Sequence, residues 1–559
     1  MIPNWEHISQ TIICKHCNVS FDITDFDRAY YKTVEVPEPT SCPKCREISR
    51  AMFRNEHNFY HAECFLCKKS IITIYQSPQE SPILCQKCFG SDKWNPISYG
   101  IKFDFLKSFS ENFMYLLQKV PKVAMLNDDS VGSVNCEYTY NVSFAKDCYL
   151  VDTSWKIENC LYCSQLSWVK NSMWIHFARD SEKLYESDYM NKCYDCKYCT
   201  DCENCSECLF CSNMTSCTQC FMCTNLQHKK YYFKNTQYTP EEYAKIVLDA
   251  KLWSDKSTKQ LKKSFETWGQ HCLTKNLHIQ NCENISKSDH VSNCANSSDI
   301  FEANNVNKSK FFWIGDGAEN CYDCTVTGGS NWCYDCVVAD NSYMVSFSFF
   351  CRESRSCSYC YNCLGCEDCF ACISLKKGRY CIFNTQYSHE EYKKVKQKII
   401  DLMMQNKEWW RFFWPEMCPH SYNETLAMES YPLSREEALT KGYTWQDNIP
   451  GTYGKETLVS LPDDIRDATP DICEWICKCE TCAKNYKIVP QELDYLYKNN
   501  LPLPRECFDC RRQRRFEKRN KRTMRDVPCH ECGKIVPTTY PENFTGKICC
   551  EECYRKMVY

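Results

Sequence analysis

The sequence predicts a multidomain, mainly β chain in which two narrow solenoids stand between two copies of a cysteine-rich module. Three observations lead to this prediction. Eight cysteines near the N-terminus recur 465 residues later, six cysteines in the middle recur 149 residues later, and small or apolar residues occupy every third position of the middle. Duplications at a constant offset indicate repeated structural units. The parts therefore follow the order A-B-B-A, where A is the module and B the solenoid.

Composition narrows the class of protein. The chain has 559 residues, of which 49 are cysteine, and a formal net charge of −3. Cysteines in C-x-x-C pairs in a chain of this length favour bound metal over a disulfide scaffold. The charge argues against a globally basic nucleic-acid coat. The N-terminal segment lacks a signal-peptide pattern, and no apolar run is long enough to span a membrane. We therefore expect a cytoplasmic protein with reduced thiols and no membrane partner.

Each end of the chain carries four C-x-x-C pairs, in modules expected at 1–95 and 471–559. One C-x-x-C knuckle supplies two thiolates, and two knuckles complete the tetrahedron that zinc prefers. Pairing consecutive knuckles gives two sites per module, and a cross-braced pairing is the alternative. The spacing predicts four structural zinc ions. The expected ligands are Cys14, Cys17, Cys42, Cys45, Cys64, Cys67, Cys85, Cys88, Cys479, Cys482, Cys507, Cys510, Cys529, Cys532, Cys550 and Cys553.

A period of three runs from Cys136 to Leu226 and from Ile279 to Leu375, and charged residues fall on the skipped positions. An α-helix cannot keep a period of 3.0 on one face, and a strand alternates with period two. A β-helix solenoid of stacked in-out-out segments fits the period. Cysteines twelve residues apart, such as Cys136 and Cys148, indicate twelve-residue coils. We expect solenoids at 131–235 and 271–384.

The inward cysteines allow three interpretations: a small apolar core filler, disulfides across the coil, or metal bound by the dense repeats at 193–223 and 351–372. Outward aromatic residues that recur with the same repeat form either a binding stripe or a packing surface. These aromatic residues include Tyr149, Tyr162, Trp174, Tyr198 and Phe210.

Helices should connect these parts. Thr239 with Glu242, and Ser388 with Glu391, have the spacing of capping boxes, which predicts helices at 236–270 and 385–415. A helical linker is expected at 96–130. Residues 416–470 should form a connector with one short helix that begins at Ser434 and ends before Gly442.

The module sequences resemble a known family. The stretch from Cys479 to Asn520 carries C-x-x-C, an aromatic residue, an acidic and aromatic turn, and then C-x-x-C-R, and the first copy is similar. This pattern is similar to the small zinc-ribbon or treble-clef family, which implies zinc and a compact fold but no reaction. The whole chain resembles uncharacterised cysteine-rich zinc-ribbon proteins of small-genome bacteria. The twelve-residue coil is similar in geometry to that of beetle antifreeze proteins.

The sequence shows no H-E-x-x-H, G-x-S-x-G, P-loop or dinucleotide motif, so we expect no enzyme. From Arg505 to Asp526 there are ten Lys or Arg residues against four Asp or Glu residues. A basic cluster beside a zinc knuckle predicts binding of RNA or single-stranded nucleic acid through phosphates. The predicted nucleic-acid-binding residues are Arg511, Arg512, Arg514, Arg515, Lys518, Arg519, Lys521 and Arg522. The alternatives are a solvated helix face, a protein-interaction scaffold built on the solenoids, and metal storage or redox buffering.

Overall fold

The computed structural model describes residues 7–33, 37–76, 81–127, 133–164, 169–173, 176–179, 188–191, 207–298, 301–304, 313–315, 325–327, 342–409, 413, 415–458, 460–520 and 522–558. Helices account for 29% and strands for 26% of the structure, so the prediction of a mainly β chain was too narrow. The chain forms two compact units. Unit 1 combines residues 1–125 with 279–449, and unit 2 combines 126–278 with 450–559. Each unit therefore contains one terminal module and the repeat segment that is remote from it in sequence.

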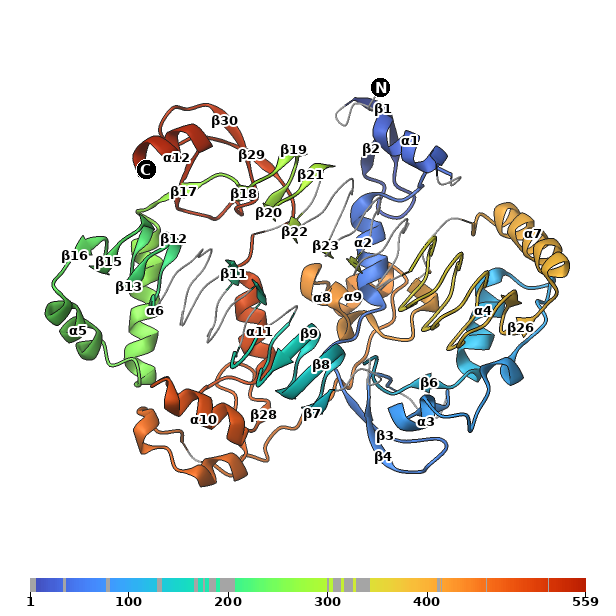
Figure 1. Ribbon diagram of the computed structural model, residues 1–559, viewed down its shortest axis with the longest axis horizontal. Helices are drawn as coiled ribbons and strands as arrows, with labels where there is room; N and C mark the ends of the chain where they lie inside the picture. Colours follow the sequence, from blue (N-terminus) through green and yellow to red (C-terminus); the bar gives the residue numbers. More distant parts are fainter. Residues whose placement is uncertain are drawn as a thin grey trace. The chain divides into compact units, whose positions relative to one another are not determined.

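Unit 1 begins with the N-terminal module. Its elements are β1 (Ile8–Ile13), β2 (Ser20–Thr24), α1 (Asp25–Thr33), α2 (Pro43–Met52), β3 (Tyr60–Glu63), β4 (Ser70–Thr73), β5 (Ile83–Leu84) and α3 (Gln86–Phe89) (Figure 1). The 3-10 helix η1 (Pro96–Tyr99), α4 (Phe109–Lys119) and β6 (Lys122–Val123) follow. The second repeat segment, residues 279–386, contains β18 (Ile279–Gln280), β19 (Glu283–Ser286), β20 (Asp289–Ser292), β21 (Ala295–Ser298), β22 (Phe301–Asn304), β23 (Trp313–Gly315), β24 (Thr325–Thr327), β25 (Cys381–Ile382) and β26 (Thr385–Gln386). After it come α7 (His389–Gln405), η3 (Pro415–Met417), η4 (Tyr422–Glu424), α8 (Leu426–Ser430) and α9 (Arg435–Thr440).

Unit 2 begins with the first repeat segment, residues 134–237. Its strands are β7 (Val134–Glu137), β8 (Tyr140–Tyr149), β9 (Asp152–Glu158), β10 (His176–Arg179), β11 (Asp188–Asn191), β12 (Ser212–Thr215), β13 (Thr218–Phe221), β14 (Thr224–Gln227), β15 (Lys230–Phe233) and β16 (Thr236–Gln237). The helices α5 (Pro240–Asp249) and α6 (Asp255–Gly269) and the strand β17 (Leu273–Lys275) follow. The remaining elements lead into the C-terminal module: η5 (Ile465–Asp467), η6 (Pro470–Glu474), β27 (Cys477–Lys478), β28 (Asn485–Tyr486), α10 (Pro490–Lys498), α11 (Phe508–Glu517), β29 (Arg525–Pro528), β30 (Ile535–Thr538), β31 (Lys547–Cys549) and α12 (Glu551–Val558).

Both repeat segments pair with themselves in parallel at a fixed offset of twelve residues. In the first, β7 pairs with β8 through Cys136 and Cys148. In the second, the offset continues through short bridges from Tyr343↔Arg355 to Phe370↔Ile382. The backbone pairing therefore has the expected repeat of twelve residues.

A left-handed residue occurs at every third position of these ladders. Asn135, Asn159 and Asn293 adopt positive φ, which asparagine tolerates well, but Phe144 and Tyr162 do so as well. Left-handed backbone costs about 1–2 kcal/mol for an L-residue that is not glycine. The N–H group of Tyr162 donates to the carbonyl of Tyr149 at 2.9 Å, and such bonds between successive twelve-residue turns offset that cost.

The positions in phase with the period of three form the core of each repeat segment. In unit 2 this core consists of in-phase residues such as Cys148, Cys211 and Met214. In unit 1 it includes Cys360 and Cys372, which are fully buried. The in-phase positions thus point inward, as the sequence pattern predicts.

Inward hydroxyl and thiol groups also satisfy the backbone. Ser354 Oγ accepts the N–H of Cys366, twelve residues on, at 3.2 Å and donates to the carbonyl of Arg352 at 2.9 Å. The N–H of Cys294 donates in the same way to Cys282 Sγ at 3.3 Å. Serine and cysteine therefore do more than fill space, because each can close hydrogen bonds that an inward alanine could not.

Asparagine side chains complete the ladders where the repeat segments end. Asn384 accepts the N–H of Ile373 and donates to its carbonyl, both at 2.8 Å. Asn235 forms the matching pair with Thr224, at 3.0 and 2.9 Å. Each amide takes the place of a further backbone partner for the last turn.

The helices after the repeat segments differ in part from the prediction. Capping boxes open α5 at Thr239 and α7 at Ser388, as expected. The single helix predicted at 236–270 is wrong, because α5 ends at Asp249 and Lys251 adopts φ 47, which interrupts the helix before Ser254 caps α6. In the connector, α9 begins after the Ser434 cap as expected, and α8 adds a second short helix.

Candidate metal centres

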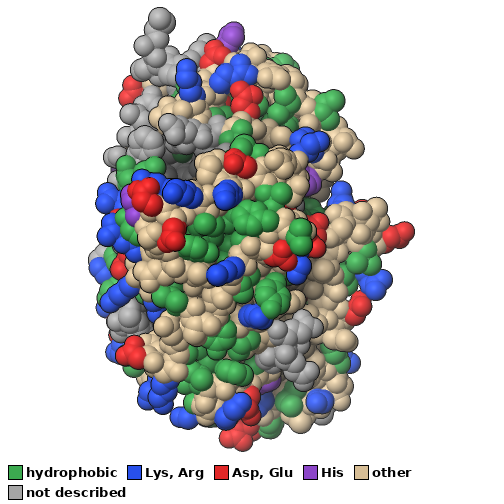
Figure 2. Space-filling view, turned by 90° about the vertical axis from the view of Figure 1, so that its right-hand side faces the viewer, with side chains coloured by type: hydrophobic (Ala, Val, Ile, Leu, Met, Phe, Trp, Pro, Cys, Tyr) green, Lys and Arg blue, Asp and Glu red, His purple; other side chains and the backbone are tan. Residues whose placement is uncertain are grey.

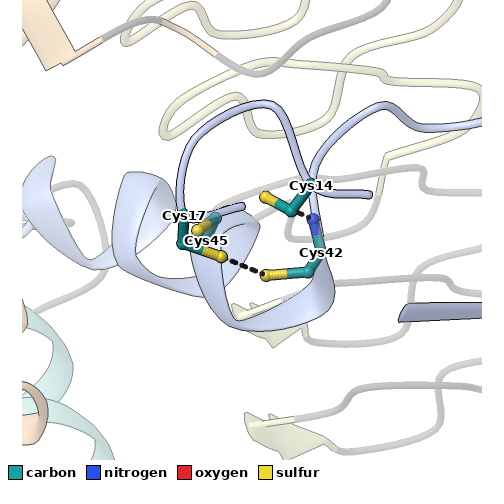
Figure 3. A group of neighbouring side chains, drawn as sticks. All are labelled: Cys14, Cys17, Cys42 and Cys45. Carbon is teal, nitrogen blue, oxygen red and sulfur yellow. Dashed lines mark hydrogen bonds between the residues drawn. The ribbon is translucent and has the colours of Figure 1, made fainter. Parts of the chain in front are cut away.

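The first candidate site lies where the hairpin β1–β2 meets the start of α2 (Figure 3). Cys14 and Cys17 occupy the turn between the strands, and Cys42 is the N-cap residue of α2. Cys45 follows in the first helical turn. The sulfur atoms of Cys17 and Cys42 are 3.6 Å apart, and the N–H of Cys42 donates to Cys14 Sγ at 3.3 Å.

The same arrangement occurs four times. In every site the four sulfur atoms lie within 4.8 Å of one another. The knuckles are grouped consecutively rather than cross-braced. The sites are Cys14/Cys17/Cys42/Cys45, Cys64/Cys67/Cys85/Cys88, Cys479/Cys482/Cys507/Cys510 and Cys529/Cys532/Cys550/Cys553.

The sulfur separations fit a bound zinc ion. The contacts across the knuckles are 3.6 Å for Cys482 and Cys507, 3.8 Å for Cys67 and Cys85, and 3.9 Å for Cys532 and Cys550. With Zn–S bonds of about 2.3 Å, a regular tetrahedron of sulfur atoms has edges of about 3.8 Å. Four thiolates complete this coordination, so such a site has a structural rather than a catalytic geometry.

Backbone N–H groups favour the thiolate form of Cys64 and Cys529, the first cysteines of their sites. Burial disfavours the charged form of Cys64, but the N–H groups of Cys67, Cys85 and Leu66 lower its pKa to about 6. The pKa of Cys529 is lowered to about 6 in the same way, against burial, by its own backbone donors. The pKa of Cys45 is raised instead, chiefly by its contact with the Cys42 thiol. Four thiolates at this spacing therefore require a cation.

The basic run of the C-terminal module lies mainly on α11. Three of its arginines repeat arginines of α2 and the residues just after it at the 465-residue offset, and both sets are buried or half-buried. The three pairs are Arg46 with Arg511, Arg50 with Arg515, and Arg54 with Arg519. These arginines are thus part of the duplicated module rather than an addition to one copy.

Arg511 joins the module to the first repeat segment within unit 2. Its guanidinium contacts Glu492 of α10 at 2.7 Å and lies 5.0 Å from the ring centre of Tyr162. The Tyr162 hydroxyl donates to the same carboxylate at 2.7 Å. Figure 1 shows α11 beside β8 and β9. Sequence reasoning missed this cluster because Tyr162 and Glu492 are 330 residues apart.

The basic residues present in only one copy also have intramolecular partners. Arg512 lies 3.5 Å from Asp152, Arg514 pairs with Glu506, and Lys518 lies 3.0 Å from Glu266. Arg522 is half-buried, and Lys521 lies outside the described residues. Among the described residues of this run, Lys518 is the exposed one, with about half of its side chain accessible. The charge available to a polyanion is therefore smaller than the sequence suggests.

In unit 1 the module contacts its repeat segment through aromatic side chains. The rings of Phe53 and Phe349 lie 5.8 Å apart, and the hydroxyls of Tyr75 and Tyr361 are 3.1 Å apart. In unit 2, Tyr162 and Phe210 are buried, and Tyr149 packs against the same hydrophobic cluster. These contacts favour a packing surface over a binding stripe for the outward aromatic residues. Trp174 and Tyr198 lie outside the described residues.

Comparison with known proteins yields no family model and no curated protein that matches the chain. The zinc-ribbon resemblance therefore stays a prediction. Within the described part of the chain, the helices are too short or too polar to cross a membrane.

Proposed function

We propose that the chain is a non-enzymatic zinc protein that acts as a protein-interaction scaffold. In this proposal the four cysteine sites hold structural zinc, and the zinc modules stabilise two slim β-solenoids whose outer faces bind protein partners. The observation that carries the proposal is the contact between module and repeat segment in each unit, made by Arg511 and Glu492 with Tyr162 in unit 2 and by Phe53 with Phe349 in unit 1. Arg511 of α11 and Phe53 at the end of α2 are thus used for contacts that hold each unit together.

The solenoid part of the proposal is supported by the parallel pairing at twelve residues and by the inward core of each repeat segment. A solenoid of this kind presents a long, regular outer surface, which suits the binding of extended or repetitive partners. The non-enzymatic part is supported by the four-cysteine sites, because four protein ligands leave zinc no open position for substrate or water.

The competing prediction, binding of RNA or single-stranded nucleic acid, requires accessible cationic groups. Burial of Arg511 and Arg515 and the ion pairs of Arg512 and Lys518 weigh against it. Figure 2 shows the side of unit 1 that carries α4 and α7, where cationic and anionic side chains alternate with apolar ones. The helices α4 and α7 carry the exposed apolar residues Tyr115 and Met404, and Leu106, also exposed, precedes α4. Such a mixed surface is more typical of a protein interface than of a phosphate-binding one.

The test is purification of the tagged protein from its native cells after mild cross-linking, with and without nuclease. We expect protein partners that survive nuclease and cross-links that fall on outward positions of the repeat segments. A variant with Cys42→Ser and Cys45→Ser, which removes half of one zinc site, should lose the partners bound by unit 1. Recovery of nucleic acid alone, or of no partner under either condition, would refute the scaffold proposal.

A further inference from the structure

One cysteine in each candidate zinc site is more accessible than the other three. Cys17, Cys67, Cys482 and Cys532 are exposed, whereas the remaining twelve ligands are buried or half-buried. The exposed residue is always the second cysteine of the first knuckle. Each of the four sites therefore has its most exposed cysteine at the same structural position.

Each exposed cysteine has a sulfur contact that crosses to the other knuckle. The sulfur atom of Cys17 lies 3.6 Å from that of Cys42, a contact that Figure 3 marks with a dashed line, and the sulfur atom of Cys482 lies 3.6 Å from that of Cys507. Cys67 lies 3.8 Å from Cys85. In every case the partner is the first cysteine of the second knuckle, at the start of a helix.

The first cysteine of each site is held differently. Cys14 Sγ accepts the N–H groups of His16 and Cys42 at 3.4 and 3.3 Å. Cys529 Sγ likewise accepts the N–H of Cys550 at 3.3 Å. Hydrogen bonds to a thiolate stabilise it and reduce its nucleophilicity, and burial limits its access to an oxidant. Oxidation should therefore begin at the exposed cysteine rather than at its neighbour in the same C-x-x-C knuckle.

We infer that these sites respond to a two-electron oxidant such as hydrogen peroxide by forming a disulfide across the knuckles, between Cys17 and Cys42 and at the three equivalent pairs. The exposed thiolate attacks peroxide, an O–O bond breaks, and a sulfenic acid and hydroxide form. The partner thiolate then attacks the sulfenic sulfur, which forms the S–S bond and expels a second hydroxide. The cysteines lose two electrons and the peroxide gains them.

This chemistry has a structural consequence. A disulfide from Cys17 to Cys42 leaves Cys14 and Cys45 as the free ligands, too few to close a tetrahedral zinc site. The new bond still joins the hairpin β1–β2 to the start of α2. Oxidised modules should therefore lose zinc but keep the connection between their two halves, unlike modules stripped by a chelator.

The inference rests on the zinc occupancy of the proposed function, and the experiment separates the two. Zinc in the purified full-length protein is first quantified by elemental analysis. The protein is then exposed to limiting hydrogen peroxide, free thiols are blocked, and disulfides are located by mass spectrometry of unreduced peptides while released zinc is measured with a chromogenic chelator. We expect disulfides at Cys17–Cys42, Cys67–Cys85, Cys482–Cys507 and Cys532–Cys550, formed together with zinc release.

A Cys17→Ser variant should lose the disulfide of the first site and keep the other three, which provide an internal control. Should the variant fail to fold, the wild-type disulfide map alone still decides the question. Disulfides within the C-x-x-C knuckles, such as Cys14–Cys17, or zinc release without any disulfide would overturn the inference. Folded protein that contains no zinc would instead overturn the proposed function.

Discussion

At the scale of single residues, the inward positions of the repeat segments have a chemical requirement beyond small size. A tight twelve-residue turn brings backbone groups toward the interior, where water cannot satisfy them. Ser348 and Ser354 each donate to a carbonyl two residues before them and accept an N–H twelve residues after them. Cysteine can make both bonds, more weakly, and also tolerates an apolar environment. This explains why the period of three selects serine and cysteine together.

Ser354 provides a test of this explanation. Replacing it with alanine leaves the buried N–H of Cys366 without its Oγ acceptor, which should lower the free energy of unfolding by about 1–3 kcal/mol. Ser354→Cys keeps both a donor and an acceptor, so its effect should be clearly smaller. Urea unfolding of the two variants measures the difference. Equal losses would show that the position requires only a particular side-chain size.

A buried histidine in unit 1 predicts a dependence on pH. His420 stacks on Tyr75, and neither ring nitrogen has a hydrogen-bond partner among the described residues. Burial, followed by the nearby charge of Lys122, lowers the pKa of His420 to about 3. The unfolded chain, with a histidine pKa of about 6.5, therefore binds the proton first as the pH falls.

Unit 1 should accordingly lose stability between about pH 6.5 and pH 3, in the range where the unfolded state takes up this proton. His420→Phe keeps an aromatic ring for stacking but cannot titrate, so its stability should depend less steeply on pH. Thermal unfolding at a series of pH values in this range measures both slopes. Parallel curves for the wild type and the variant would contradict the assignment.

At the scale of secondary-structure elements, the cysteines of α11 could be assigned from the sequence, but the contacts of its arginines could not. The cysteine spacing predicted which cysteines at its N-terminus belong to a candidate zinc site, because the ligand pattern is encoded within a few residues of the knuckle. The basic run predicts a phosphate-binding surface only when it is considered alone, because the partners of these charges lie elsewhere in the chain. Glu492 is on α10 and Asp152 is in the first repeat segment. The sequence around α11 contains no signal for a carboxylate such as Asp152, which folding brings to the helix from hundreds of residues away.

Arg511 and Arg514 therefore form a matched pair for mutation on one helix. Arg511→Met should destabilise unit 2 by about 3–5 kcal/mol, because it leaves the fully buried Glu492 without its cation. Arg514→Ala should cost at most about 1 kcal/mol, since this side chain is more accessible. Urea unfolding provides the comparison. Adding Glu492→Gln to Arg511→Met should restore part of the loss, and no restoration would mean that the ion pair is not the source of the effect.

At the scale of the whole molecule, the sequence predicts the duplicated order A-B-B-A, but it does not predict which module packs with which repeat segment. The offsets of 465 and 149 residues identify the copies. They do not say that the N-terminal module belongs with the second repeat segment and the C-terminal module with the first, as the two units show. That choice depends on side-chain contacts such as Tyr75 with Tyr361, whose residues are 286 positions apart.

Disruption of one candidate zinc site should therefore destabilise a part of the chain that is distant in sequence. In the full-length protein, Cys42→Ser with Cys45→Ser should weaken the contacts that Phe53 and Tyr75 make with the second repeat segment. Amide hydrogen exchange should then accelerate at residues 343–383 and stay unchanged at 209–234, although the latter are nearer in sequence. The matched variant, Cys507→Ser with Cys510→Ser, should instead accelerate exchange at residues 140–164, where Tyr162 and Asp152 contact the C-terminal module. Exchange that rose at the sequence neighbours of each mutated site, or equally in both repeat segments, would contradict this pairing of modules with repeat segments.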